Sequence, residues 1–312
     1  MLKETTPVTG AQYYLERQTA KGLLKATITQ VGASLRTFQL DEIDFVEDYD
    51  PNRQAPLCAG QIMSPWVNRL DGGTWTFNGQ QFKNQINIES QQNSNHGLLL
   101  ERAYDVIHLD DSVVILQANL DSPAGYPFNV ETSVEYRLNE NGISVTHRAI
   151  NRSSVAIPYA TGAHPYFKIS GTNTGELTLI SSAKTHTLVN DRQIPIGESP
   201  TEGTVFDISG GIRVKDYFFD DDFSGLQLDE AGHSHCYLKS PAGETLDVWQ
   251  DSNFRHVVIF TPDFFPSVTG DKVHAVAIEP STSPPNALNS NINLIWLEPN
   301  IEFSATWGVT VI

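Results

Sequence analysis

Apolar and polar residues alternate with a period of two along most of this chain, the pattern of β-strands buried on one face. In the clearest case the apolar face is Val130, Thr132, Val134, Tyr136 and Leu138. The next four residues, 139–142 (Asn-Glu-Asn-Gly), predict a turn because Asn and Gly tolerate a positive φ. The alternation then resumes over residues 143–147, so this stretch predicts a β-hairpin.

A second hairpin is predicted where Asn78-Gly79 separates residues 74–77 from 80–82, because this pair favours a tight two-residue turn. Further predicted strands are 23–31, 34–40, 104–109, 112–119, 244–250, 254–261, 273–278 and 303–311. No segment has a sustained apolar stripe of helical period with caps. The pattern therefore predicts an all-β protein.

The chain has 312 residues without a fixed-period repeat, a low-complexity tract or a Gly-, Ser- or Pro-rich linker. We therefore expect one domain over residues 1–312, since large all-β domains often exceed about 200 residues. So many strands do not fit one small barrel. We expect large antiparallel sheets packed face to face as a β-sandwich.

Charge narrows the possible partners. The chain has 20 basic and 37 acidic residues, a net charge of −17, and such a field repels phosphate backbones and anionic lipids. We expect no nucleic-acid or membrane partner and favour a neutral small molecule. Residues 1–7 lack the apolar core of a signal peptide, and no apolar run is long enough to span a membrane. A cytoplasmic protein with its two cysteines, Cys58 and Cys236, reduced is the expectation.

Two segments in the first third of the chain are candidates for binding. Asn68 and Arg69 follow Trp66, and an arginine offers a fixed fork of donors for sugar hydroxyls, although a surface arginine explains the pattern as well. His96, in Asn95-His96-Gly97, follows a polar loop (90–94) of the kind that carries binding residues on β scaffolds. A solvated loop histidine is the alternative.

Two later segments are candidates for acid–base chemistry. His164 precedes Pro165, which favours an extended backbone, and two aromatic residues that suit a sugar ring follow. A histidine titrates near neutrality and suits a general acid or base, unless it is a satisfied core histidine. Glu279 is expected at the end of the strand 273–278, where a proline-rich loop would hold a carboxylate firmly. A surface glutamate is the alternative.

Metal binding is not expected. His233-Ser234-His235-Cys236 places its two histidines on one face of an extended segment and its cysteine on the other, without a second ligand pair at zinc spacing. The run Asp220 to Asp222 is too irregular for a calcium loop of the EF-hand type and is interpreted as an acidic turn, with one member reaching a site.

Taken in order, these segments resemble the aldose 1-epimerase (galactose mutarotase) family. The matching pieces are Asn68-Arg69, Asn95-His96-Gly97, Gly125-Tyr126-Pro127, His164-Pro165-Tyr166-Phe167, Asp220 to Phe223, Glu279-Pro280 and Pro284-Pro285-Asn286-Ala287. The His-Pro-Tyr-Phe and Pro-Pro-Asn-Ala segments are more similar to a less characterised bacterial branch than to galactose-specific members. The resemblance therefore leaves the preferred sugar open.

The resemblance implies a large antiparallel β-sandwich, or supersandwich, with an open sugar cleft and no cofactor. It assigns the general base to Glu279, the general acid to His164, and a position near the ring oxygen to His96. Arg69 and Asp220, with Asn68 beside them, match residues that hold sugar hydroxyls; Asp220 is chosen over its neighbours by its offset to Phe223. An acidic neighbour such as Asp220 is expected to raise the pKa of His164.

The expected activity is interconversion of the α and β anomers of a free aldohexose, by a monomer or weak dimer. One alternative is a hexose-6-phosphate mutarotase, but only Arg69 and Lys168 lie near the motifs to hold a phosphate. The other is a non-catalytic sugar-binding protein on the same scaffold. A pure binder needs no acid–base pair, so Glu279 and His164 together favour the enzyme.

Overall fold

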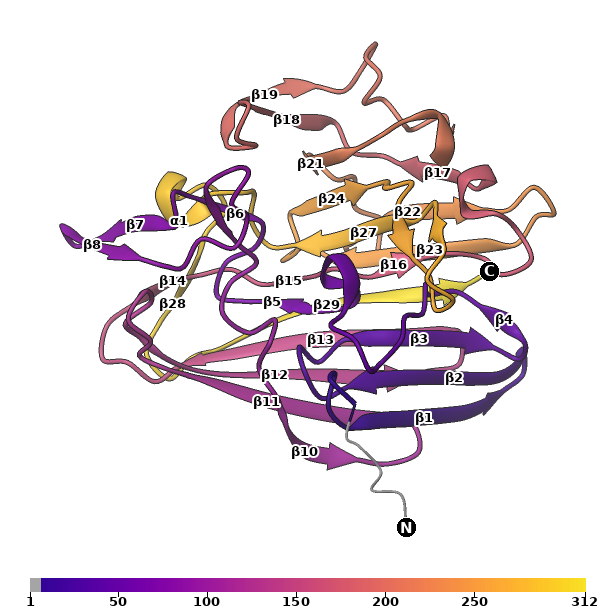
Figure 1. The fold of residues 1–312 in the computed structure, drawn as a ribbon, viewed down its shortest axis with the longest axis horizontal. Helices are drawn as coiled ribbons and strands as arrows, with labels where there is room; N and C mark the ends of the chain where they lie inside the picture. The colour runs from indigo at the N-terminus through magenta and orange to yellow at the C-terminus, as the bar shows by residue number, and fades with distance from the viewer. Residues whose placement is uncertain (1–6) are drawn as a thin grey trace.

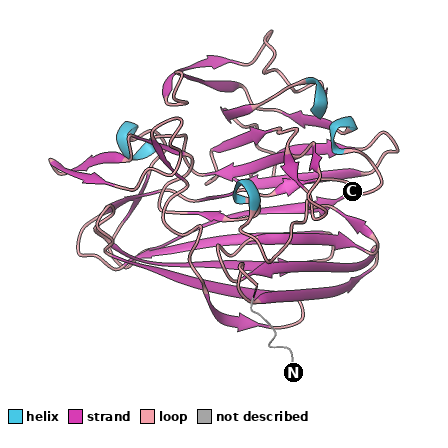
Figure 2. Ribbon diagram, viewed as in Figure 1, coloured by secondary structure: helices cyan, strands magenta, loops and turns pink. Residues whose placement is uncertain are grey.

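The computed structural model describes residues 7–312, and β-strands make up nearly all of its regular structure (Figures 1 and 2). Residues 1–6 lie outside this range. The expectation of no signal peptide rests mostly on these residues. Three large sheets account for most strands, and their strand pairings are antiparallel.

A nine-stranded sheet has the order β10 (Asp105–Leu109), β11 (Val113–Asp121), β12 (Asn129–Leu138), β13 (Gly142–Asn151), β29 (Glu302–Val311), β23 (Thr245–Asp251), β22 (His233–Lys239), β17 (Thr178–Ser181) and β20 (Ile212–Arg213). An eight-stranded sheet has the order β19 (Pro195–Pro200), β18 (Thr185–Val189), β21 (Asp220–Ser224), β24 (His256–Phe260), β27 (Val276–Ser281), β15 (Gly162–Ala163) and β5 (Ile62–Met63), and β16 (Tyr166–Phe167) also pairs with β27.

A four-stranded sheet joins β1 (Gln12–Thr19), β2 (Gly22–Thr29), β3 (Leu35–Leu40) and β4 (Ile43–Asp44). The separate strand pairs are β6 (Arg69–Asp71) with β9 (Asn93–Asn95), β7 (Thr74–Phe77) with β8 (Gln80–Lys83), β14 (Ile157–Tyr159) with β28 (Ile295–Leu297), and β25 (Phe265–Pro266) with β26 (Lys272–Val273). The short helical segments are η1 (Pro56–Cys58), η2 (Thr174–Glu176), η3 (Val214–Asp216) and α1 (Ala287–Ser290).

One hydrophobic core joins the three large sheets. It contains Ile28 of β2, Tyr136 of β12 and Ile278 of β27, each almost completely buried. Burial of one face of each sheet against another is what stabilises a β-sandwich, at about 25 cal/mol for each Å² of apolar surface removed from water. The expected all-β antiparallel sandwich is confirmed (Figure 1).

The predicted hairpin of β12 and β13 is confirmed, with the expected apolar face buried. The reason given for its turn is wrong, because no residue from Asn139 to Gly142 has a positive φ. Gly142 is instead required by close packing: a Cβ atom there would lie 1.9 Å from the carbonyl oxygen of Val309 in β29. The hairpin of β7 and β8 does use its Asn78-Gly79 pair as predicted, with φ values of 47° and 79°.

One predicted strand boundary is wrong in a way that matters for function. The expected strand 273–278 is β27, which begins at Val276 and continues to Ser281. Glu279 therefore lies inside a strand that is buried along its whole length, and not at its end. A strand covered on both faces lacks the alternating pattern that marks a surface strand, so the pattern does not place its limits.

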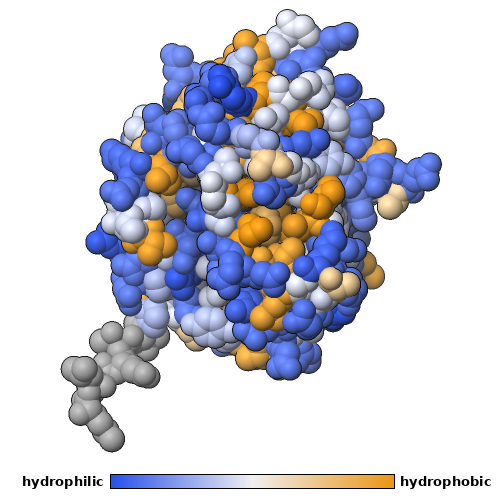
Figure 3. Space-filling view, turned by 90° about the vertical axis from the view of Figure 1, so that its right-hand side faces the viewer, coloured by the Kyte–Doolittle hydropathy of each residue, from blue (hydrophilic) through white to orange (hydrophobic). Residues whose placement is uncertain are grey.

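On the face drawn in Figure 3, hydrophobic residues gather near the middle and hydrophilic residues surround them. Within residues 7–312, none of the helices has the length and apolar character needed to cross a membrane.

Candidate active site

The residues proposed from the sequence converge on one cavity of about 290 Å³. Its walls include all six: Asn68, Arg69, His96, His164, Asp220 and Glu279. Glu279 and His164 approach closely, with 3.3 Å between Glu279 Oε1 and His164 Nε2. Residues more than a hundred positions apart in the chain therefore share one site.

Glu279 reaches the cavity from β27 of the eight-stranded sheet. Its neighbours along the strand, Ile278 and Pro280, are buried, so the strand is fixed on both sides. Val258 of β24 lies opposite Glu279 in the sheet register. The Oε2 atom of Glu279 is buried and has no hydrogen-bond partner in the described structure. A rigid strand thus holds a carboxyl group in the cavity wall with one oxygen that no described protein group binds.

His164 lies between the two short strands β15 and β16. Its backbone is held at both ends: its N–H donates to the carbonyl of Gln61 at 3.0 Å, and its carbonyl accepts from the N–H of Gly60 at 2.9 Å. The imidazole stacks on the ring of Tyr166, with 5.1 Å between the ring centres. His164 Nδ1 is buried without a partner.

His96 is held by a tight reciprocal pair of hydrogen bonds with Asn68. The His96 N–H donates to the Asn68 carbonyl at 3.1 Å, and the Asn68 N–H donates to His96 Nδ1 at 3.2 Å. Since Nδ1 accepts, the proton of the neutral imidazole lies on Nε2. Gly97 makes this turn possible, because a Cβ atom there would lie 2.0 Å from the Ser64 carbonyl oxygen.

Arg69 and Asp220 form a two-point ion pair at the cavity wall. Arg69 Nη2 lies 2.6 Å from Asp220 Oδ2, and Nη1 lies 3.2 Å from Oδ1. Arg69 Nε also donates to Gln91 Oε1 at 2.9 Å, and Nη1 to Asn68 Oδ1 at 2.9 Å. The Asn286 N–H binds the carbonyl of Arg69 at 2.7 Å, which ties the Pro-Pro-Asn-Ala segment to β6. The guanidinium is thus fixed from several sides.

The three consecutive aspartates have three different environments. Asp220 alone of the three lines the cavity. Asp221 Oδ1 lies 2.8 Å from His186 Nε2, on the opposite side of β21. Asp222 is buried against His256, with 3.0 Å between Asp222 Oδ2 and His256 Nδ1. The choice of Asp220 from its offset to Phe223 therefore agrees with the geometry.

Burial sets the protonation of the two central groups. It raises the pKa of Glu279 well above its usual range; Asp220 raises it further and Arg69 opposes this. Burial also lowers the pKa of His164 to about 3, and the Arg69 charge adds to the shift. The expectation of a raised His164 pKa is wrong, because burial is the largest cause of the shift and lowers that pKa. Without a sugar, both groups favour their neutral forms.

The pKa of His96 is lowered well below its usual range as well, by burial first and then by His164 and Arg69. A neutral His96 agrees with the hydrogen bond that its Nδ1 accepts. Within residues 7–312, no group of three or more His, Cys, Asp or Glu side chains is placed to hold a metal ion.

A comparison with protein families identifies this architecture. The family model described as aldose 1-epimerase matches residues 17–310. The chain belongs to the aldose 1-epimerase family. Its members are isomerases, so the chain is an enzyme of that class.

Individual relatives of this chain agree with the family assignment. The uncharacterized protein YihR of Escherichia coli is 29% identical over 89% of this chain and 87% of its own length. The galactose mutarotase of Sus scrofa is 24% identical over 80% of this chain and 78% of its own. Among solved structures, a GalM/aldose epimerase homologue from C. elegans has a TM-score of 0.82 at 19% identity, covering 97% of this chain and 99% of that one. These matches support a galactose mutarotase-like fold.

The aromatic residues near the cavity are distributed differently from the sequence-based interpretation. Trp66 and Tyr166 are buried, and neither lines the cavity; Tyr166 supports His164 instead. The aromatic residue in the cavity wall is Phe260, and Cys58 also contributes to the wall. Phe260 lies in a predicted strand, but alternation alone does not tell which face of that strand meets a ligand.

Proposed function

We propose that the protein is an aldose 1-epimerase that interconverts the α and β anomers of a free, neutral aldohexose. The observation that carries this proposal is the contact between Glu279 and His164, two groups capable of acid–base chemistry, 3.3 Å apart in one cavity. Family membership supports the same reaction class. That the enzyme is cytoplasmic, and a monomer or weak dimer, stays a prediction.

In the proposed reaction, the Glu279 carboxylate takes the proton of the anomeric hydroxyl while His164 Nε2 donates a proton to the ring oxygen. The bond between the anomeric carbon and the ring oxygen breaks, and a carbonyl group forms at the anomeric carbon. Rotation of the carbonyl group presents its other face. Reclosure with the two proton transfers reversed gives the other anomer, so the reaction consumes no proton and needs no cofactor.

The electrostatics of the site favour these transfers. A carboxylate whose pKa is raised by burial is a strong base, and an imidazolium whose pKa is lowered is a strong acid. Before reaction the pair carries two opposite charges; after both transfers it carries none. Burial therefore favours the ring-opened complex over the ion-pair state, and the ion pair itself forms when the proton that rests on Glu279 moves to His164 on sugar binding.

The remaining polar groups suit recognition of a neutral sugar. We propose that Arg69 and Asp220 bind hydroxyls, with Asn68 holding Arg69, and that His96 donates from Nε2 near the ring oxygen. A fixed guanidinium beside a carboxylate offers hydroxyls both donors and acceptors at defined positions.

The hexose-6-phosphate alternative is less well supported. Among the described residues that line the cavity, Arg69 is the one lysine or arginine, and its guanidinium is already paired with Asp220. Lys168 Nζ lies 3.0 Å from Glu47 Oε2, and Lys168 does not line the cavity. A phosphate group entering this site would meet two carboxyl groups, Asp220 and Glu279, and no unpaired lysine or arginine.

Polarimetry tests the proposal. Freshly dissolved α-glucose, α-galactose and α-glucose 6-phosphate are followed with and without the protein, and the spontaneous rate is subtracted. We expect acceleration with at least one neutral sugar and little with the phosphate. Acceleration of glucose 6-phosphate alone would favour the phosphate alternative. Sugar binding without any acceleration would favour a non-catalytic binder and overturn the proposal.

A further inference from the structure

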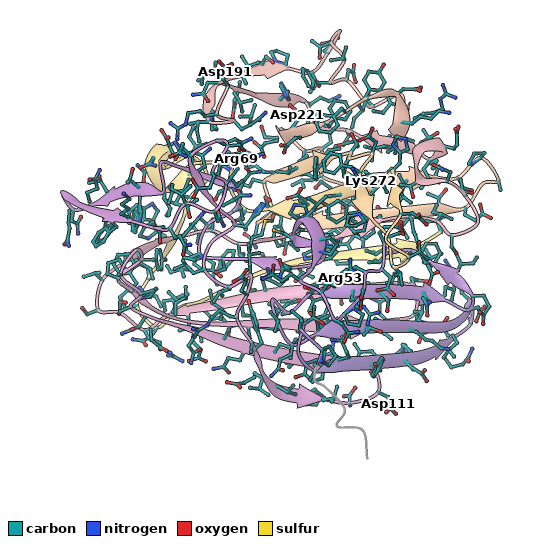
Figure 4. All side chains as sticks on the ribbon, in the orientation of Figure 1. Arg53, Arg69, Asp111, Asp191, Asp221 and Lys272 are labelled. Carbon is teal, nitrogen blue, oxygen red and sulfur yellow. The ribbon has the colours of Figure 1, made fainter. Side chains whose placement is uncertain are left out.

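Arg192 connects the part of the molecule that carries Asp220 with the loop that contacts Arg69. These two residues form the pair that we propose binds sugar hydroxyls. Arg192 lies in the turn between β18 and β19, and β18 pairs with β21, the strand that begins with Asp220. Its guanidinium reaches the loop before β9, which carries Gln91. In Figure 4 the turn, marked by Asp191, lies above Arg69.

The contacts of Arg192 use all three of its nitrogen atoms. Nε donates to the Gln91 carbonyl at 2.9 Å, and Nη2 donates to the Gln92 carbonyl at 2.9 Å and to Asn93 Oδ1 at 3.0 Å. Nη1 lies 2.8 Å from Asp71 Oδ1. In return, Asn93 Nδ2 donates to the Arg192 carbonyl at 2.7 Å. One side chain thus binds the backbone carbonyls of two residues and the side chain of the next.

The turn that carries Arg192 is itself rigid. The Asn190 side chain accepts from the Arg192 N–H at 2.9 Å and from the Ile194 N–H at 3.1 Å. The backbone N–H of Asn190 also donates to the Ile194 carbonyl at 3.0 Å. Such side-chain-to-backbone bonds preset a turn before any long-range contact forms. Arg192 is therefore presented from a fixed base.

The loop held by Arg192 leads directly to the cavity. Gln91 Oε1 accepts from Arg69 Nε at 2.9 Å, and Arg69 binds Asp220 through its other two nitrogen atoms. Arg192 itself does not line the cavity. We propose that Arg192 is a positioning residue for substrate binding, acting through Gln91 to orient the Arg69 guanidinium. This inference rests on the proposed function, in which Arg69 and Asp220 hold the sugar hydroxyls.

The fork geometry of arginine is essential to this role. A lysine at position 192 retains the charge that pairs with Asp71, but its single ammonium group cannot reach acceptors on three successive residues in the same way. The ion pair with Asp71 is about half exposed on both sides and contributes little by itself. The positional effect is therefore assigned to the hydrogen bonds to residues 91–93.

The test measures mutarotation kinetics of the full-length protein with the sugar that gives the highest wild-type rate. We expect Arg192→Ala to raise KM about five- to tenfold, the effect of losing about one ordinary hydrogen bond at the sugar, with kcat within about twofold. Arg192→Lys is expected to lie nearer to Ala than to the wild type. Asp71→Asn, which leaves the three acceptors in place, is expected to change KM by less than about twofold.

A double-mutant cycle separates positioning from general loosening of the structure. If Arg192 acts through Gln91, Gln91→Ala raises KM alone, and adding Arg192→Ala to it raises KM little further. Arg152→Ala is the matched control. The wild-type Arg152 side chain is 45% exposed, against 42% for Arg192, and Arg152 Nη2 lies 3.0 Å from Oε2 of Glu131 in the nine-stranded sheet. The KM of this variant should equal that of the wild type.

Wild-type activity decides the proposed function, and the variants decide this inference. An active wild type with an unchanged KM in a folded Arg192→Ala protein overturns the role of Arg192. So do independent, additive effects of the Gln91 and Arg192 changes. If Arg192→Ala does not fold, the Arg192→Lys and Gln91→Ala variants carry the same test, and normal KM values in both overturn the inference.

Discussion

Replacing Glu279 with glutamine removes the proposed base and changes little else. Glutamine has nearly the shape of glutamate, and it can keep its side chain beside His164 Nε2, which lies 3.3 Å from Glu279 Oε1 in the wild type. Arg69 and Asp220 are untouched, so sugar binding should persist. General acid–base catalysis contributes about 10²- to 10⁴-fold, so kcat should fall by that factor, an increase of about 3–5 kcal/mol in the activation barrier.

The same substitution should stabilise the fold at neutral pH. Because burial raises the pKa of Glu279, the folded state holds its proton more tightly than the unfolded state does. Wild-type stability therefore falls as pH rises from the ordinary glutamate range toward the raised value. Glutamine does not titrate. The unfolding free energy of Glu279→Gln should exceed that of the wild type by an amount that grows as pH rises from the ordinary glutamate range toward the raised pKa. Below this range the pH-dependent difference should vanish.

Three measurements check this prediction: polarimetry of a fresh α-anomer, titration calorimetry of sugar binding, and urea unfolding at several pH values. Glu47→Gln is the matched control, since burial also raises the pKa of Glu47 but this residue pairs with Lys168 outside the cavity. The control should keep wild-type activity. A Glu279→Gln protein that retains more than about a tenth of the wild-type rate would refute the assignment of the base.

Three further results are expected. His164→Asn, which cannot donate a proton to the ring oxygen, should lower kcat about 10²-fold with little change in KM, measured by polarimetry. The pH profile of wild-type kcat/KM should fall on the alkaline side, as pH rises through the raised pKa of Glu279 and the pair with His164 loses its single proton. Arg69→Lys should raise KM about tenfold, because lysine cannot form the two-point pair with Asp220.

Sequence patterns predicted the long hairpins because their alternation directly reports burial on one face. β12 and β13 lie where the period of two placed them. The short strands from β16 to β21 escaped prediction, since a strand of two to six residues is too brief to establish a period. β19 contains a proline at each end, which is tolerated at the edge of the sheet but weakens a strand signal. The division into a single domain stays a prediction.

For the site, motifs were sufficient to name the residues that meet, but not to describe their environment. Nothing in the sequence around Glu279 indicates that it lies inside a fully buried strand, and its raised pKa follows from that burial. Gln91 belonged to a polar loop that was recognised as a place for binding residues. Its partner Arg192 had no signal at all, because the two are brought together only by the packing of a distant hairpin.

Under the proposed assignment, the Arg69–Asp220 pair binds a polar sugar without fixing the position of the proton shared by Glu279 and His164. Arg69 lowers the pKa of Glu279 and Asp220 raises it, so the two charges act in opposite directions and burial remains the largest cause of the shift. The same burial disfavours the charged form of His164. The opposite charges of the binding pair offset each other. Burial of the site therefore remains the main influence on proton transfer between Glu279, His164 and the sugar. An unpaired arginine at this place would favour ionised Glu279 and weaken it as a base, which is a physical reason for Asp220 to accompany Arg69 in the wall.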